Sequence, residues 1–499
     1  MIMRMIMAAM TATLMLMSAA AQNVQSLVDK LDSQEPLRSS SWGVLAVDGH
    51  GRTLASLNPQ RKLSPASNMK LITTGLAIKT IGPDYCFHTH IGYDGTITDG
   101  VLHGDLYIIG GGDPTLATSD SIATDYTKVF AEWKQFLKKE GIRSIDGLVI
   151  GDGRLFDEYL ENSSWNYDDI ATYYGTGSDA LMFYANTIDY AVTPGKAVGN
   201  PVNVAPIFPR TPWLKIDNLS TTSPTGTDNT LYFFTTDFTT DISLRGQFPI
   251  SRKSKTENAS NKYGALTCAY YFNNYLNASG ISTGGYADID RHNMIRTGPG
   301  QSTGREAAGH PTSISFTLSP TVSDIARETN HRSDNLYAET LLRAISLHKT
   351  GSASYDSCHV AITRELEELG VSCEGRFVHA DGSGLSRLNL VTPEFMVDYL
   401  KAMHGTFTFV PFVISLPSPG SNGTMRSILP GLSQSVKSRI RLKSGSMSNI
   451  LCYSGYILPS TGKRDDTIYF SILVNNCDAP FSILRPEITS IIAALAENN

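Results

Sequence analysis

The chain has 499 residues, which is too long for one compact domain, so we expect two or three domains. Hydrophobic residues make up 41% and charged residues 18% of the chain, a composition that excludes a disordered or fibrous protein. The net charge of −6 at pH 7 argues against a broad basic surface, and we expect no nucleic-acid partner.

The first 21 residues have the pattern of a secretory signal peptide. Arg4 supplies a positive charge, residues 5–17 are apolar, and residues 18–21 (Ser-Ala-Ala-Ala) offer a cleavage site before Gln22. The apolar run is too short for a spanning helix, although an uncleaved N-terminal anchor is the alternative. No later segment is apolar enough to cross a bilayer, so we expect a periplasmic or otherwise secreted protein without an integral membrane segment.

Six cysteines are compatible with export but establish no disulfide by themselves. Cys452 and Cys477 lie on two predicted strands joined by a turn and form the most plausible pair. Cys358 and Cys373 form a weaker pair, because a helix between them would hold them roughly 15 Å or more apart. Buried free thiols are the alternative for all six.

The predicted elements begin with an α/β pattern. Residues 41–57 form a strand, a Gly/Asp turn and a second strand, and the apolar spacing over 67–81 predicts a helix. From about residue 86 to residue 287, short alternating strands predominate, and one helix near 127–139 interrupts them.

The C-terminal part returns to helices and ends in two strands and a helix. The predicted elements are helices at 321–328, 334–348, 359–369 and 393–403, strands at 438–458 and 467–476, and a helix at 483–496. Because strands at both ends enclose these helices, we predict an α/β domain built from both ends of the chain with a mostly β insertion. The predicted domains are the signal peptide at 1–21, a catalytic domain at 22–88 and 300–499, and two small inserted domains within 89–299.

A serine and a lysine stand one turn apart at the start of the helix predicted over 67–81. Ser67 and Lys70 then lie on one face, so the lysine amine can reach the serine hydroxyl. Since a serine hydroxyl is a poor nucleophile at its own pKa, it needs such a base, and partial burial can lower a lysine pKa enough to provide one.

This motif alone is weak, because its elements recur along the chain. A second Ser-x-x-K lies at Ser346–Lys349, and Ser-x-Asn begins at Ser56, Ser164 and Ser333. The Lys349-Thr350-Gly351 copy of Lys-[Ser/Thr]-Gly closes a predicted helix, where lysine and glycine are ordinary residues, and we interpret it as structural coincidence.

The other copy, Lys443-Ser444-Gly445, lies in an alternating strand. A strand edge can present a lysine, a hydroxyl and a backbone N–H to an extended peptide. Only the order Ser67/Lys70, Ser333/Asn335, Lys443/Gly445 places the three elements on a helix, an inter-helix loop and a strand. That trio is typical of penicillin-binding proteins and class A β-lactamases.

Over nearly all of its mature length, the sequence resembles the class C low-molecular-mass penicillin-binding proteins, the D-Ala-D-Ala carboxypeptidase/endopeptidase family. The resemblance is carried by PASNMK (65–70), GDLYIIGGGDPTL (104–116), IGDGRLFD (150–157), SDNLYAETLLR (333–343), DGSGLSRLN (381–389), KSGS (443–446) and YSGY (453–456). It implies a serine β-lactamase/transpeptidase-like domain, and the long separation of Ser67 from Ser333 fits the domains that this family inserts there.

The resemblance also implies roles for the matching residues. Ser67 attacks the carbonyl of the penultimate D-Ala and Lys70 takes its proton. Ser333 relays a proton to the leaving D-Ala with electrostatic support from Lys443, and Asn335 holds the substrate amide.

The strand residues bind the end of the substrate. Lys443 and Ser444, which replaces the commoner threonine of the family, bind the terminal carboxylate. The backbone N–H groups of Ser67 and Ser446 form the oxyanion hole, which contributes about 3 kcal/mol per donor, and Gly445 also binds the substrate.

Two further segments are less specific. Asp381, Ser383 and Ser386 shape a loop near the site, with glycine-rich turn chemistry as the alternative. A pocket for the free ammonium of the stem peptide, or alternatively a surface acid pair, is formed by Asp168 or Asp169 with Tyr173 or Tyr174.

The resemblance therefore implies a serine DD-peptidase that acts on peptidoglycan stem peptides in the bacterial cell envelope and is acylated by β-lactam antibiotics. No metal or organic cofactor is expected, and the sequence does not decide between carboxypeptidase and endopeptidase activity. A β-lactamase-like hydrolase is one alternative, opposed by the long insertion and the DGSGLS segment. A non-catalytic peptidoglycan-binding paralogue is another, opposed by the intact Ser67, Lys70, Ser333, Asn335 and Lys443.

Overall fold

The computed structural model describes residues 23–156 and 159–497, so the predicted signal peptide lies outside the described residues. The chain divides into two compact units. The first comprises the described residues up to Pro83, Ala326–Asp334 and the described residues from His359. The second comprises Asp84–Ile325 and Asn335–Cys358. Among the described residues, no helix is both long and apolar enough to cross a bilayer.

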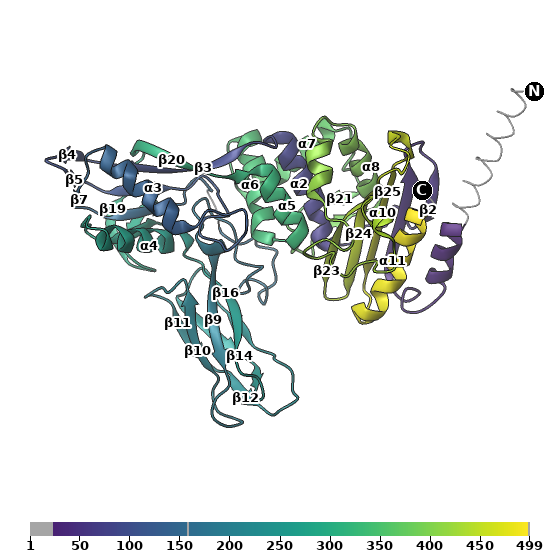
Figure 1. Ribbon diagram of the computed structural model, residues 1–499, viewed down its shortest axis with the longest axis horizontal. Helices are drawn as coiled ribbons and strands as arrows, with labels where there is room; N and C mark the ends of the chain where they lie inside the picture. The colour runs from purple at the N-terminus through teal and green to yellow at the C-terminus, as the bar shows by residue number, and fades with distance from the viewer. Residues whose placement is uncertain (1–22, 157–158, 498–499) are drawn as a thin grey trace, which may run out of the picture. The chain divides into compact units, whose positions relative to one another are not determined.

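The first unit is built on a five-stranded antiparallel sheet in the order β2-β1-β25-β24-β23. Its strands are β1 (Ser41–Asp48), β2 (Thr53–Leu57), β23 (Ile440–Met447), β24 (Ile450–Ile457) and β25 (Ile468–Asn475). Figure 1 shows the purple N-terminal strands in one sheet with the yellow-green C-terminal strands. The predicted α/β domain built from both ends of the chain is confirmed.

Every residue of β24 and β25 is buried, because helices cover both faces of this sheet. One face packs against a helix at 23–32 and α11 (Phe481–Glu497), and α8 (Pro393–His404) contacts β25 and β1. The nearly fully buried α2 (Met69–Thr80) contacts α8, where the Tyr399 hydroxyl donates to the Leu71 carbonyl at 3.0 Å. Shorter elements are η1 (Ala66–Asn68), β21 (Phe377–Val378), β22 (Leu390–Val391), α9 (Phe409–Ser415), α10 (Gln434–Lys437) and η3 (Arg464–Asp466).

The second unit contains a seven-stranded mixed sheet in the order β19-β18-β17-β8-β6-β3-β20. Its strands are β3 (Cys86–Tyr93), β6 (Leu106–Ile109), β8 (Val149–Asp152), β17 (Tyr286–Ile289), β18 (Met294–Arg296), β19 (Ser302–Glu306) and β20 (Thr312–Thr321). An apolar core joins it to α3 (Tyr126–Lys139) and α4 (Gly264–Ala278), near a small sheet of β4 (Thr96–Thr98), β5 (Val101–His103) and β7 (Ser144–Ile145).

The sequence predicted only one helix in this region, and that prediction was wrong about α4. Most of α4 is buried, including Leu266, Cys268 and Phe272, so its polar and apolar residues do not separate into two faces. In addition, its tyrosine, phenylalanine and threonine residues are typical of strands and its asparagines of turns, so its composition does not indicate a helix.

Three small sheets make the rest of the second unit mostly β, as predicted (Figure 1). They are formed by β9 (Thr187–Thr193), β10 (Asn203–Phe208) and β16 (Lys255–Ser260), by β11 (Lys215–Asn218), β13 (Tyr232–Phe234) and β14 (Asp241–Arg245), and by β12 (Thr221–Ser223) and β15 (Gln247–Pro249). The short helix η2 (Tyr184–Asn186) precedes β9, and α6 (Asn335–Thr350) also belongs to this unit. Two helices, α5 (Val322–Arg332) and α7 (Tyr355–Glu368), contain residues of both units.

The domain boundaries at 88/89 and 299/300 stay a prediction. In the structure, β19 and β20 extend the sheet of the second unit beyond residue 299, because β20 pairs with β3. Residues 335–358 group with the same unit.

All six cysteines are free thiols, so the suggested Cys452–Cys477 pair is wrong. The strand register places Cys452 opposite Leu473, and Cys477 follows four residues later, beyond the end of β25. At the rise of a strand this offset is about 13 Å, which exceeds the reach of a disulfide.

Candidate active site

The predicted nucleophile lies in η1, immediately before α2, in the first unit. Lys70 Nζ donates hydrogen bonds to Ser67 Oγ at 3.0 Å and to the Ser383 carbonyl at 2.7 Å. The Lys70 side chain is completely buried. The structure thus brings together the hydroxyl and the amine that the sequence paired, at a distance suited to proton transfer.

Two glycines let neighbouring segments reach the turn that carries Ser67. A Cβ at Gly445 would collide with the Pro65 carbonyl and would lie 3.0 Å from the Ser67 nitrogen. A Cβ at Gly384, whose φ is +80°, would collide with the Ala66 carbonyl. β23 and the 381–386 loop therefore pack directly against the Ser67 backbone.

Two asparagine side chains fix the same turn. The amide of Asn475 accepts from the Ser64 N–H at 2.8 Å and donates to the Ser64 carbonyl at 3.0 Å. Asn68 Nδ2 donates to Ser454 Oγ at 2.8 Å. The sequence analysis did not predict a role for Asn475, Asn68 or Ser454. For Ser454 a signal was present, because this residue lies in the YSGY segment that carries part of the family resemblance.

A second lysine lies against the other predicted serine. Lys443 Nζ donates to Ser333 Oγ at 2.9 Å and to the Ser444 carbonyl at 2.7 Å. Lys443 is completely buried, and this burial, followed by repulsion from Lys70, lowers the pKa of its amine well below the ordinary value. Lys443 is therefore suited to exchange a proton with Ser333.

Ser333 itself occupies a left-handed backbone conformation, with φ of +62°, between α5 and α6. Such conformations in residues other than glycine cluster at functional sites. In this conformation the Ser333 hydroxyl accepts the hydrogen bond from Lys443.

β23 is the last strand of its sheet, and it carries four of the predicted site residues, Lys443 to Ser446. Its inner edge pairs with β24, with Lys443 opposite Ser454 and Gly445 opposite Cys452. Ser444 is half-buried and Ser446 is exposed. An edge strand can add an extended peptide along its outer side.

The DGSGLS segment forms a buried turn held by Asp381. Its carboxylate accepts from the backbone N–H of Gly384 at 2.7 Å and of Ser386 at 2.6 Å, and from Asn389 Nδ2 at 2.7 Å. Thr73 Oγ1 donates to the Gly382 carbonyl at 2.7 Å. Ser383 thus contacts Lys70 through its backbone carbonyl, and this loop orients the lysine.

The remaining predicted residues lie in the second unit. Asn335 begins α6, and its Nδ2 donates to the Tyr174 carbonyl at 2.9 Å. The Tyr174 hydroxyl donates to Asp169 at 3.2 Å, and burial together with Asp169 raises its pKa to about 12. Asp168 and Tyr173 are exposed on the same segment. Asn335, Tyr174 and Asp169 are therefore connected by hydrogen bonds.

The Lys349-Thr350-Gly351 copy ends α6, as predicted, and Gly351 has a φ of +77°. Glycine in this conformation commonly follows the end of a helix.

Comparison with known proteins identifies the family of this chain. Residues 24–497 match the D-Ala-D-Ala carboxypeptidase 3 (S13) family, and the chain belongs to it. A D-alanyl-D-alanine carboxypeptidase from Actinomadura sp. (strain R39) is 28% identical over 465 residues, covering 91% of this chain and 81% of the relative. The carboxypeptidase DacB of Haemophilus influenzae is 23% identical over 468 residues, covering 90% of this chain and 88% of the relative.

The fold is similar to a crystal structure of penicillin binding protein 4 from Haemophilus influenzae, with a TM-score of 0.79. The two share 20% identity over 95% of this chain and 99% of the other. Family membership confirms the predicted class, a serine-type D-Ala-D-Ala carboxypeptidase.

Proposed function

We propose that the chain hydrolyses the terminal D-Ala-D-Ala bond of peptidoglycan stem peptides through an acyl-enzyme on Ser67. The observation that carries this proposal is the hydrogen bond of 3.0 Å between buried Lys70 and Ser67. This pair lies beside an edge strand whose Gly445 touches the Ser67 backbone.

Acylation begins when the Ser67 hydroxyl gives its proton to Lys70 and its oxygen bonds to the carbonyl carbon of the penultimate D-Ala. The backbone N–H groups of Ser67 and Ser446 bind the resulting oxyanion. The close approach of Gly445 to Ser67 supports this arrangement, because it brings the two backbone segments together.

The leaving D-Ala needs a proton when its C–N bond breaks. Ser333 relays to this amine the proton that Lys70 took from Ser67, and Lys443, whose pKa is lowered by burial, supports the transfer. Lys443 and Ser444 bind the terminal carboxylate of the substrate. Water then attacks the acyl-enzyme and releases the shortened peptide, while Ser67 recovers its hydroxyl proton.

Further substrate contacts come from residues that the sequence predicts. Asn335 binds a substrate amide, and the segment with Asp168, Asp169, Tyr173 and Tyr174 receives the free ammonium of the stem peptide. The hydrogen bonds that join Asn335, Tyr174 and Asp169 support a shared role.

β-Lactams acylate Ser67 because their strained amide takes the place of the D-Ala-D-Ala bond. The Haemophilus influenzae protein is described in complex with a β-lactam, which supports this reactivity. The signal-like residues 1–21 support export to the periplasm or beyond.

The test is incubation of the purified protein with an N-acetylated peptide that ends in D-Ala-D-Ala, with free D-Ala measured over time. We expect one D-Ala per peptide and no release by Ser67→Ala. A cross-linked muropeptide dimer assayed in parallel measures endopeptidase activity. D-Ala release by a folded Ser67→Ala variant would contradict the proposal.

A further inference from the structure

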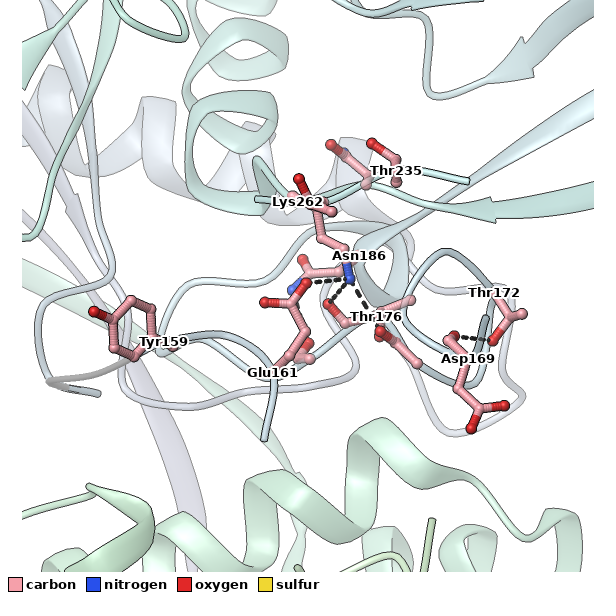
Figure 2. Close-up of polar contacts among 12 residues, drawn as sticks. Tyr159, Glu161, Asp169, Thr172, Thr176, Asn186, Thr235 and Lys262 are labelled. Carbon is pink, nitrogen blue, oxygen red and sulfur yellow. Dashed lines mark hydrogen bonds and ion pairs between the residues drawn. The ribbon is translucent and has the colours of Figure 1, made fainter. Parts of the chain in front are cut away.

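A third buried lysine lies in the second unit, directly before α4. Lys262 Nζ lies 2.7 Å from the Glu161 carboxylate and donates to the carbonyls of Gly175 at 3.0 Å and Thr176 at 3.2 Å (Figure 2). Its side chain is 1% exposed. The buried ammonium therefore forms one ion pair and two hydrogen bonds to backbone carbonyls.

The two carbonyls belong to a short irregular stretch, which we call the 174–177 segment. All four of its carbonyls accept hydrogen bonds from side chains. Tyr174 accepts from Asn335 at 2.9 Å, Gly175 and Thr176 accept from Lys262, and Gly177 accepts from Asn186 Nδ2 at 3.3 Å. Buried carbonyls require such partners, and here side chains replace the ladder of a regular element.

The 174–177 segment is therefore a fixed platform for the Asn335 side chain. The Tyr174 carbonyl accepts a hydrogen bond from Asn335 Nδ2, and this contact restrains the orientation of the side-chain amide. Asn335 follows Ser333 by two residues in the Ser-x-Asn motif. A shift of the Tyr174 carbonyl would therefore rotate the Asn335 side-chain amide, which binds the substrate in the proposed reaction.

We infer that Lys262 is a positioning residue, which holds the 174–177 segment so that the Tyr174 carbonyl orients Asn335 for substrate binding. This inference rests on the proposed function, in which Asn335 binds the substrate amide. Glu161 maintains the arrangement, because its carboxylate opposes the loss of the Lys262 charge in the buried environment.

The first test compares Lys262→Met with Arg154→Met. Arg154 forms a half-buried ion pair with Asp152 in the same unit, and its other hydrogen bonds go to Asn293 and Ala308, outside the 174–177 segment. The rate constant for acylation by benzylpenicillin is measured well below each unfolding temperature. We expect a loss of about tenfold for Lys262→Met, because misplaced binding groups slow the reaction, and less than about twofold for Arg154→Met.

The decisive measurement repeats Lys262→Met in an Asn335→Ala background. If Lys262 acts through Asn335, the further loss of acylation rate is below about twofold, although the unfolding temperature falls in both backgrounds. An equal fold-loss in both backgrounds, or a wild-type rate in folded Lys262→Met, would overturn the inference.

Glu161→Gln serves where Lys262→Met does not fold. It should slow acylation by a few-fold in the wild-type background and leave the Asn335→Ala rate unchanged. Equal losses in both would overturn the inference. Absence of acylation in the unaltered protein would overturn the proposed function and this inference with it.

Discussion

Lys443 in the first unit and Lys262 in the second are both deeply buried, but they bind different oxygens. Lys443 donates to a serine hydroxyl and a carbonyl, both neutral, whereas Lys262 lies against the Glu161 carboxylate and two carbonyls. Burial lowers the pKa of both amines, and Lys70 lowers that of Lys443 further, while Glu161 opposes the shift at Lys262. A buried lysine among neutral groups and another cation is suited to proton transfer, whereas one beside a carboxylate is suited to hold structure.

The largest expected effect is the loss of activity in Lys443→Met. Because the proposed proton relay through Ser333 depends on this amine, kcat/KM should fall about 10²–10⁴-fold. The free energy of unfolding should stay equal or rise by about 1 kcal/mol, because the change removes a buried amine whose charged form is disfavoured by burial and by Lys70. Peptide hydrolysis and thermal unfolding measure the two effects, and a strong loss of stability would contradict the contrast with Lys262.

Lys262→Met should show the opposite balance. It leaves the Glu161 carboxylate, which is 12% exposed, without its cation, and breaking such a pair costs about 3–5 kcal/mol of unfolding free energy. The double variant with Glu161→Gln should recover part of this loss. Denaturant titration measures the free energy of unfolding of the single and the double variant. If Lys262→Met is as stable as the wild type, Lys262 does not differ from Lys443 in its contribution to stability.

Asp179 extends the comparison to a carboxyl group in the second unit. Burial among protein atoms raises its pKa to about 7, while a hydrogen bond from the Ala180 N–H opposes the shift. Between about pH 4 and pH 7 the unfolded carboxyl loses its proton and the folded one keeps it, so this group lowers stability as pH rises.

Asp179→Asn should therefore gain stability over the wild type progressively from pH 4 to pH 7, with no further gain above. We expect on the order of 2 kcal/mol, because partial access of water to Asp179 reduces the effect of its pKa shift. Unfolding temperatures of the two proteins across this pH range test the sign. A difference that shrinks as pH rises would contradict it.

The smallest effect concerns the hydroxyl of Ser444 on β23. Ser444→Ala should lower kcat/KM about tenfold, since it removes one hydrogen bond to a charged carboxylate. Ser444→Thr keeps the hydroxyl and should change kcat/KM by less than about twofold. Equal losses in the two variants would indicate that the hydroxyl does not bind the substrate.

Local patterns explain which parts of this molecule the sequence predicted. The strand with Lys443 was predicted from its alternating residues, and the helix after Ser67 from apolar residues at 69, 71, 72, 76 and 78, although α2 is buried on nearly all sides. α4 is less completely buried than α2, and it was missed because its tyrosine, phenylalanine and threonine residues are typical of strands and its asparagines of turns. The Cys452–Cys477 pairing failed because it depended on a strand register that only the assembled sheet defines.

The candidate site shows the same limit. Motif order indicated Ser67, Lys70, Ser333 and Lys443, and the structure joins them into two hydrogen-bonded pairs. Asn335 and Tyr174, which form a hydrogen bond, are 161 residues apart in the sequence, so no local pattern predicts their contact. Lys262 lies in an ordinary polar stretch, so its burial and its three oxygen partners follow only from the tertiary fold.

The most direct test of the central claim is intact-mass spectrometry after mixing the purified protein with benzylpenicillin. We predict a stable adduct of one benzylpenicilloyl group that peptide mapping assigns to Ser67, and none in Ser67→Ala. Rapid turnover of the antibiotic without an accumulating adduct would indicate a β-lactamase-like hydrolase, and an adduct on another residue would contradict the assignment of Ser67 as the nucleophile.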